Sequence, residues 1–199
     1  MPLNGVYYYT QQTNQLGSIN PSTGVSVGIP LPYTLNYSDL YAAANGSLWI
    51  ALSALSQPAI LQFNPTTGAS TTYTAGIEVA GSPVKITAAP DGTIWFSTAN
   101  GKLGQLNPTT GTISLHVVEA PSVQLYGLIV TPDGSIWYTG ERFVNNIGIN
   151  GFIGHFQPTA GSVTEYPIAD AAGDLVYGPD HNVWFTENNG TINRVTTGY

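Results

Sequence analysis

Short runs of alternating apolar and polar residues, separated by turn residues, follow one another along the whole chain. Residues 90–111 show the pattern most clearly, with a turn at Pro90–Gly92, an apolar run around Trp95, a second run, and a turn that ends at Gly111. Runs of about four to eight residues with period-two alternation, bounded by Pro, Asp, Asn and Gly, are typical of β-strands joined by tight turns. We therefore expect an all-β protein.

The pattern recurs, and each copy is marked by an aromatic residue that we call the Trp position. The tryptophans are spaced 46, 42 and 47 residues apart, and a tyrosine stands in the same phase before them; the five residues are Tyr8, Trp49, Trp95, Trp137 and Trp184. Around each tryptophan the strands carry apolar residues on both sides, so one copy cannot bury its faces alone. Four-stranded antiparallel units at this spacing stack radially as the blades of a β-propeller.

We expect one propeller domain over residues 1–199. Its repeats lie at approximately 4–32, 33–76, 77–120, 121–168 and 169–199. The first copy has no room for an innermost strand and the last copy has none for an outermost strand. A closed ring of five blades with irregular first and last blades is the arrangement we favour. An open arc completed by another chain and a piece of a larger propeller are the alternatives.

Composition excludes several classes of function. Charged residues make up 8% of the chain, with 4 Lys and Arg against 11 Asp and Glu, so we expect no nucleic-acid partner. No apolar run is long enough to cross a bilayer, and the first residues do not resemble a signal peptide. The absence of cysteine excludes disulfides and thiolate metal sites. A polar surface made largely of Thr, Ser, Asn and Gln is associated with extracellular or virion-surface proteins.

Two stretches of the repeat carry a resemblance to a known family. ITAAPDGTIWFSTANGKLGQLNPTTG and LVYGPDHNVWFTENNGTINRV resemble the repeat of the virginiamycin B lyase family, and the likeness covers nearly the whole chain. The resemblance implies a propeller fold, seven-bladed in those lyases, and a Mg-dependent elimination that opens streptogramin B antibiotics. In that family the catalytic histidines stand eleven residues before the Trp position, where this chain has Ser38, Val84, Tyr126 and Gly173. We therefore expect the fold without the family's catalytic histidines.

The first candidate site lies one residue further along each repeat. Ten residues before the Trp position stand Asp39, Lys85, Gly127 and Asp174. Three charges at one repeat phase, in a chain this poor in charge, predict a group at one mouth of the channel that binds a cation, a water cluster or a polar ligand. The alternative is a compensated Asp–Lys–Asp network with a purely structural role.

The second candidate site is an insertion at Glu141–Gly151, which we interpret as a loop on the same face. It contains Glu141, Arg142 and Phe143, and long loops on one propeller face are usual sites of recognition. The alternative is a solvated loop. Tyr126 lies near the same side and could stack on a sugar. For the histidines His116, His155 and His181, we expect structural roles.

These features favour a non-catalytic propeller that binds or assembles, as a surface or virion component. We expect no catalytic residue and no cofactor, and we leave the question of a metal site open. The expected partner is a protein or a glycan, and a homo-oligomer stays open. The alternative is a lyase-like enzyme of the virginiamycin B lyase type, which acts in the channel mouth and requires Mg²⁺.

Overall fold

The computed structural model describes the chain apart from residues 1–2, 4, 12–14, 32–36, 54–56, 78–80, 120–121, 146 and 198–199. Within the described residues, eighteen strands form five antiparallel sheets that follow one another in chain order. No described helix has the length and apolar character needed to cross a membrane.

Three of the sheets have four strands, each hydrogen-bonded to the next along the chain. They consist of β4 (Tyr37–Ala42), β5 (Leu48–Leu52), β6 (Ala59–Phe63) and β7 (Ser70–Tyr73); of β8 (Pro83–Ala88), β9 (Ile94–Thr98), β10 (Lys102–Leu106) and β11 (Ile113–Val117); and of β12 (Val123–Val130), β13 (Ile136–Val144), β14 (Ile147–Gln157) and β15 (Ser162–Pro167).

The first and last sheets have three described strands each. They consist of β1 (Tyr7–Thr10), β2 (Gln15–Ile19) and β3 (Ser26–Pro30), and of β16 (Ala172–Tyr177), β17 (Val183–Glu187) and β18 (Ile192–Val195). The prediction of a propeller with about five sheets is confirmed. The repeat boundaries near residues 33 and 120 lie outside the described residues, and the division into repeats stays a prediction.

The predicted turn chemistry shapes the connection between the first two strands of a sheet. The Gly92 N–H donates to the Ala89 carbonyl at 3.0 Å, and the Asp91 carboxylate accepts from the Thr93 N–H at 2.9 Å. Gly92 has a φ of +86°, which glycine adopts without strain. His181 occupies the corresponding place in the last sheet with a φ of 61°, so it is a turn residue, as its position in the sequence predicts.

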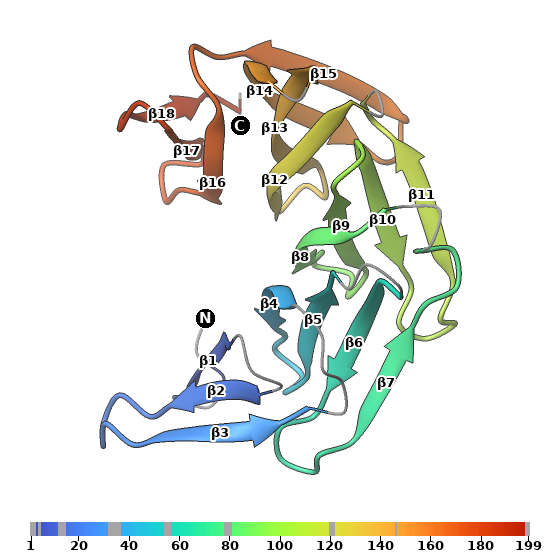
Figure 1. Cartoon of the computed structure of the whole chain (residues 1–199), viewed down its shortest axis with the longest axis vertical. Helices are drawn as coiled ribbons and strands as arrows, with labels where there is room; N and C mark the ends of the chain where they lie inside the picture. The colour runs from blue at the N-terminus through green and yellow to red at the C-terminus, as the bar shows by residue number, and fades with distance from the viewer. Residues whose placement is uncertain are drawn as a thin grey trace.

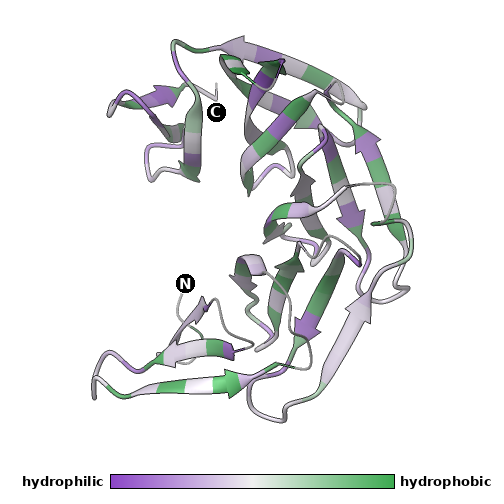
Figure 2. Cartoon of the chain, viewed as in Figure 1, coloured by the Kyte–Doolittle hydropathy of each residue, from purple (hydrophilic) through white to green (hydrophobic). Residues whose placement is uncertain are grey.

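The core lies between neighbouring sheets. Trp49, Trp95 and Trp137 are each 2% exposed, and each belongs to a buried cluster that includes residues of the following sheet. Rings of this size bury roughly 150–250 Å² each. Figure 2 shows the contrast with the outside of the molecule: β5 is almost wholly apolar, whereas the outer strand β7 is pale.

The sheets form an open arc and not the closed five-bladed ring that we favoured from the sequence. Figure 1 shows β4, β8, β12 and β16 innermost, with the first and last sheets at the two ends of the arc and a gap between them. Five sheets at this spacing do not complete the circle (Figure 1).

The insertion is also different from its prediction. The described residues of the insertion, 141–145 and 147–151, do not form a long loop; they lengthen β13 and β14 into a hairpin in which Val144 pairs with Ile147. Asn145 has a φ of 52°, the left-handed conformation that a tight hairpin turn requires and that asparagine tolerates. The run of Phe, Val and Ile around the two asparagines satisfies strand pairing, which the sequence interpretation overlooked.

Candidate functional site

Three charged residues from three sheets meet near the axis of the arc, as their common repeat phase predicts. The ammonium nitrogen of Lys85 on β8 lies 3.1 Å from a carboxylate oxygen of Asp174 on β16 and 3.7 Å from one of Asp39 on β4. The other Asp39 oxygen accepts the Ile86 N–H at 3.0 Å. The structure therefore assembles the predicted group, apart from Gly127, which brings no side chain.

The two carboxylates of this group lie in different environments. The Asp39 side chain is 25% exposed, and burial raises the pKa of its carboxyl, an effect that the Ile86 N–H and the Lys85 charge only partly offset. The Asp174 side chain is 66% exposed. Burial lowers the pKa of Lys85, but the two carboxylates outweigh it and the net shift is upward. Lys85 therefore stays charged at neutral pH, with Asp174 as the accessible carboxylate.

Tyr126 and Glu141 form a second polar pair close by. The Tyr126 hydroxyl on β12 donates to a Glu141 carboxylate oxygen on β13 at 3.2 Å. Burial, followed by the nearby Glu141 charge, raises the pKa of Tyr126 to about 12. The phenol is therefore a hydrogen-bond donor at neutral pH and has no role as a base.

Lys85, Asp174, Tyr126 and Glu141 line one pocket, which we call the axial pocket, with a volume of about 480 Å³. Asp39 pairs with Lys85 but is not among the residues that line this pocket. All four positions that stand eleven residues before a Trp position line it too, namely Ser38, Val84, Tyr126 and Gly173. Ala171, Ala172 and Asn188, which no sequence signal marks, complete the wall.

Backbone packing shapes the pocket where the fourth and fifth sheets meet. The Thr139 hydroxyl, fully buried, accepts the Gly127 N–H at 2.7 Å and donates to the Gly173 carbonyl at 2.7 Å. A Cβ at Gly127 would lie 2.8 Å from that hydroxyl oxygen and 3.0 Å from the Gly173 oxygen. Glycine at residue 127 is therefore a packing requirement, which explains the missing fourth charge at this repeat phase.

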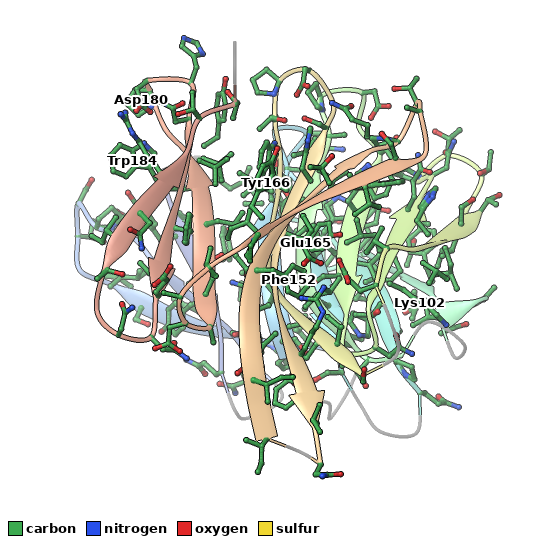
Figure 3. The ribbon with its side chains drawn as sticks, turned by 90° about the horizontal axis from the view of Figure 1, so that it is seen from above. Lys102, Phe152, Glu165, Tyr166, Asp180 and Trp184 are labelled. Atoms are coloured by element: carbon green, nitrogen blue, oxygen red, sulfur yellow. The ribbon has the colours of Figure 1, made fainter. Side chains whose placement is uncertain are left out.

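Arg142 and Phe143, predicted as ligand-binding candidates, are not among the residues that line the axial pocket. The Arg142 guanidinium pairs with Glu165 and, at 3.4 Å, with Glu119. It also lies 4.5 Å from the centre of the Phe152 ring, and Figure 3 shows Glu165 and Phe152 close together on the fourth sheet. Arg142 thus joins β13, β14 and β15 to the segment that follows β11. Sequence reasoning missed this network because its two glutamates have no common repeat phase.

The histidines have structural surroundings outside the axial pocket. The His116 ring packs against Trp95 with ring centres 5.3 Å apart, and the His155 ring stacks on Trp137 at 4.2 Å. Burial lowers the pKa of both imidazoles. His181 lies in its turn, where its ring accepts or donates a hydrogen bond with the Tyr177 hydroxyl.

The donor set of the axial pocket does not fit a Mg²⁺ ion. Asp39 and Asp174 both pair with the Lys85 ammonium, and Glu141 accepts from Tyr126. Among the described residues, no three His, Asp or Glu side chains come together as a metal site. Mg²⁺ demands near-octahedral geometry from one or two carboxylates and several waters, whereas the carboxylates here are directed at Lys85 and Tyr126.

A larger pocket of about 770 Å³ is lined mainly by residues of the second and third sheets, with Val130 and Pro132 of the fourth and Tyr177 of the fifth. Three of its polar side chains already serve their own turns: Asn45, Asp91 and Asn107 each accept a backbone N–H two residues further along. The axial pocket is smaller, but it brings together charged side chains from different sheets. We therefore regard it as the better candidate for a ligand-binding site.

Comparison with known proteins places the chain in a family. A sequence model of the Virginiamycin B lyase family matches residues 36–198. The chain belongs to the virginiamycin B lyase family. No curated protein matches it in a sequence search.

Members of the virginiamycin B lyase family are also among the solved structures it resembles. A catalytically inactive variant of virginiamycin B lyase from Staphylococcus aureus, solved with quinupristin, is 22% identical with a TM-score of 0.79; the match covers 97% of this chain and 64% of that one. A streptogramin B lyase structure is 19% identical with a TM-score of 0.64, over 98% and 80% of the two chains. The WD40 propeller domain of Doa1 reaches a TM-score of 0.76 at 12% identity, over 98% and 61%. At these identities the likeness shows the propeller fold, and the chain spans less than two thirds of the first of these lyases.

Proposed function

We propose that this protein is a non-catalytic binding module of the virginiamycin B lyase family, which holds a cationic side chain of a protein partner in the axial pocket. One observation carries the proposal. The four positions at which the family resemblance places catalytic histidines all line this pocket, and they are Ser38, Val84, Tyr126 and Gly173. None of them supplies a general base, because Tyr126 keeps its proton and the other three have no group that titrates near neutral pH.

Charge supports a cationic ligand. Lys85 brings one positive charge to a pocket lined by the carboxylates of Asp174 and Glu141, and the carboxylate of Asp39 pairs with Lys85 from outside the lining. Asp174 is the carboxylate most open to solvent, so it can accept a second ammonium or guanidinium without losing Lys85. Val84, Ala171 and Ala172 give an apolar wall that suits the methylene stem of a lysine or arginine.

The test uses two tripeptides, acetyl-Gly-Lys-Gly-amide and its neutral norleucine counterpart, titrated into the ¹⁵N-labelled protein. We expect the lysine peptide to shift the amide signals of Lys85 and Asp174, and the norleucine peptide to leave them in place. Asp174→Asn should weaken binding by about two- to five-fold, because the contact is partly exposed. Asp180→Asn makes the same change in net charge outside the pocket and should have no effect. Equal shifts with both peptides, or equal weakening by both variants, would overturn the proposal.

Family membership favours one second candidate, a lyase that opens a cyclic depsipeptide. The protein can be incubated with quinupristin, with and without Mg²⁺, and the products separated by chromatography and identified by tandem mass spectrometry. We expect only the intact cyclic compound in both samples. A linear isomer would show that the pocket is catalytic and would refute the non-catalytic part of the proposal.

A further inference from the structure

The larger of the two pockets lies at the opposite end of the inner strands from the axial pocket. Residues toward the N-terminal ends of β4, β8, β12 and β16, the innermost strands in Figure 1, line the axial pocket. Residues toward the C-terminal ends of the same strands line the larger pocket; they are Tyr41, Ala88, Val130 and Tyr177. Residues 43–45, 88–94 and 107–109 supply most of its wall, and we call it the turn pocket.

Two tyrosines of the turn pocket stand where the other tryptophan-bearing sheets have no aromatic residue. Tyr41 pairs with the tryptophan of its sheet; the residues that do so in the other sheets are Thr87, Ile129 and Val176. Tyr177 pairs with the residue before its tryptophan; the residues that do so in the other sheets are Ala42, Ala88 and Val130. Both tyrosines are half-buried, so each leaves part of a ring, apolar with a hydroxyl at its tip, accessible to a ligand.

The side-chain amides of Asn45 and Asn107 are held as hydrogen-bond donors. The Asn45 Oδ1 accepts the Ser47 N–H at 3.0 Å, and the Asn107 Oδ1 accepts the Thr109 and Thr110 N–H groups at 2.9 and 3.2 Å. The turns thus occupy both oxygens, and within the described part of the chain no hydrogen bond engages either NH₂ group. Both side chains are exposed and line the turn pocket, so each NH₂ group can donate to a ligand. At the Asn45 position the other tryptophan-bearing sheets have aspartate, which has no such donor.

The charge of the turn pocket limits the class of ligand. Its lining, drawn from the described residues, contains no Lys, Arg or His and a single carboxylate, that of Asp91. This carboxylate already accepts the Thr93 N–H at 2.9 Å. An anionic ligand would find no counter-charge here, and a cationic ligand would find one partly engaged carboxylate, so neither would recover the cost of leaving water. The pocket therefore suits a neutral ligand that has apolar faces and several groups that form hydrogen bonds.

We propose that the turn pocket binds a short neutral oligosaccharide. The C–H faces of the sugar rings pack on Tyr41 and Tyr177, and the sugar hydroxyls accept hydrogen bonds from the amides of Asn45 and Asn107. Because a hydroxyl also donates, a second hydroxyl can bond the Asp91 carboxylate. The volume of about 770 Å³ lies within the range of about 300–1,000 Å³ that is usual for small-molecule sites. The axial pocket stays free when the turn pocket is filled, because the two lie at opposite ends of the inner strands.

A proline-rich peptide is the competing class of ligand, because aromatic side chains also line the grooves that hold such peptides. Proline has no N–H group. A proline-rich segment would therefore cover the Asp91 carboxylate and the Thr93 and Thr109 hydroxyls without giving them a donor, and a buried acceptor without a donor costs binding free energy. Sugar hydroxyls supply these donors, which favours the oligosaccharide.

The test titrates four neutral trisaccharides into the ¹⁵N-labelled full chain. Maltotriose, cellotriose, mannotriose and triacetylchitotriose cover α- and β-linked glucose, mannose and N-acetylglucosamine. We expect at least one of them to shift the side-chain NH₂ signals of Asn45 and Asn107 saturably, at millimolar concentration or below. The main-chain amide signals of Lys85 and Asp174 in the axial pocket should stay in place. The peptide acetyl-Pro-Pro-Pro-Pro-amide, titrated in the same way, should leave the Asn45 and Asn107 signals unchanged.

Two asparagine variants form a matched pair, followed at the Asn45 signal. Asn107→Asp keeps an oxygen for its turn but removes the NH₂ donor, and it should weaken binding about two- to ten-fold, the range of a lost hydrogen bond. Asn64→Asp makes the same change in the second sheet, where the Asn64 Oδ1 accepts two main-chain N–H groups at 2.9 and 3.1 Å outside the pocket lining, and it should have no effect. Tyr41→Thr and Tyr177→Ala introduce the residue types of other sheets at the same repeat positions, and each should weaken binding to a similar extent. Thermal unfolding checks that all four variants fold.

Several results would overturn the proposal. The first is the absence of a saturable shift at the Asn45 and Asn107 signals with every trisaccharide. The second is equal weakening of binding by Asn107→Asp and Asn64→Asp, and the third is unchanged binding in both tyrosine variants. Tighter binding of the tetraproline peptide than of any trisaccharide at these signals would assign the turn pocket to a protein segment instead.

Discussion

The Thr139 hydroxyl offers the sharpest test of how the sheets are joined at the axial pocket. It is fully buried and bonds the Gly127 N–H of its own sheet and the Gly173 carbonyl of the next, both at 2.7 Å. Thr139→Val keeps the shape of the side chain and removes both bonds. A buried main-chain group without a partner costs about 1–3 kcal/mol, so two of them should lower the free energy of unfolding by about 2–6 kcal/mol.

Two comparison variants separate the contribution of the Thr139 hydroxyl to the free energy of unfolding from the contribution of side-chain packing. Thr139→Ser keeps the hydroxyl and deletes one methyl group, which should cost about 1 kcal/mol. Thr186 stands at the same repeat position in the last sheet but is exposed, so Thr186→Val should change stability by less than about 0.5 kcal/mol. Urea unfolding followed by tryptophan fluorescence measures all three variants. If Thr139→Val costs no more than Thr139→Ser, the hydroxyl does not bridge the sheets and the reasoning fails.

Two further predictions concern charge and burial. Burial raises the pKa of the Asp39 carboxyl in the folded state. Between the ordinary pKa of aspartate and this raised pKa, the folded state binds more protons than the unfolded state. The free energy of unfolding therefore falls as the pH rises through that window. Asp39→Asn keeps an oxygen for the Ile86 N–H and should remove this dependence of the unfolding free energy on pH, measured by unfolding curves from about pH 3.5 to 7. An unchanged dependence would show that another group causes it. Ile153→Ala should lower the free energy of unfolding by about 2–5 kcal/mol because its side chain is fully buried. Ile192→Ala, at the same repeat position but 70% exposed, should cost less than about 0.5 kcal/mol, and similar losses in the two variants would show that the β18 face is covered in solution.

The sequence by itself determined the repeat and what each repeat position does locally. The aliphatic residues around each tryptophan, the Pro-Asp-Gly turns and the spacing of 42 to 47 residues predict four-stranded sheets stacked through aromatic rings. These features depend on interactions between residues close in the chain or one repeat apart, so the pattern of residue types is enough to reveal them. The same phase analysis placed Asp39, Lys85 and Asp174 at one height along the axis, and the structure brings them together.

Only the tertiary structure decided how the arc ends and which side chains share a site. Whether the sheets close into a ring depends on the angle between each sheet and the next, and a pattern of residue types does not give that angle. The insertion illustrates a second limit, because Glu141 reaches Tyr126 while its neighbour Arg142 reaches Glu119 and Glu165. Adjacent residues of a strand point to opposite faces, and which face meets the pocket follows from strand pairing. Ile192 illustrates the same limit: it has the residue type of a buried position, and only the structure shows that its side chain is 70% exposed.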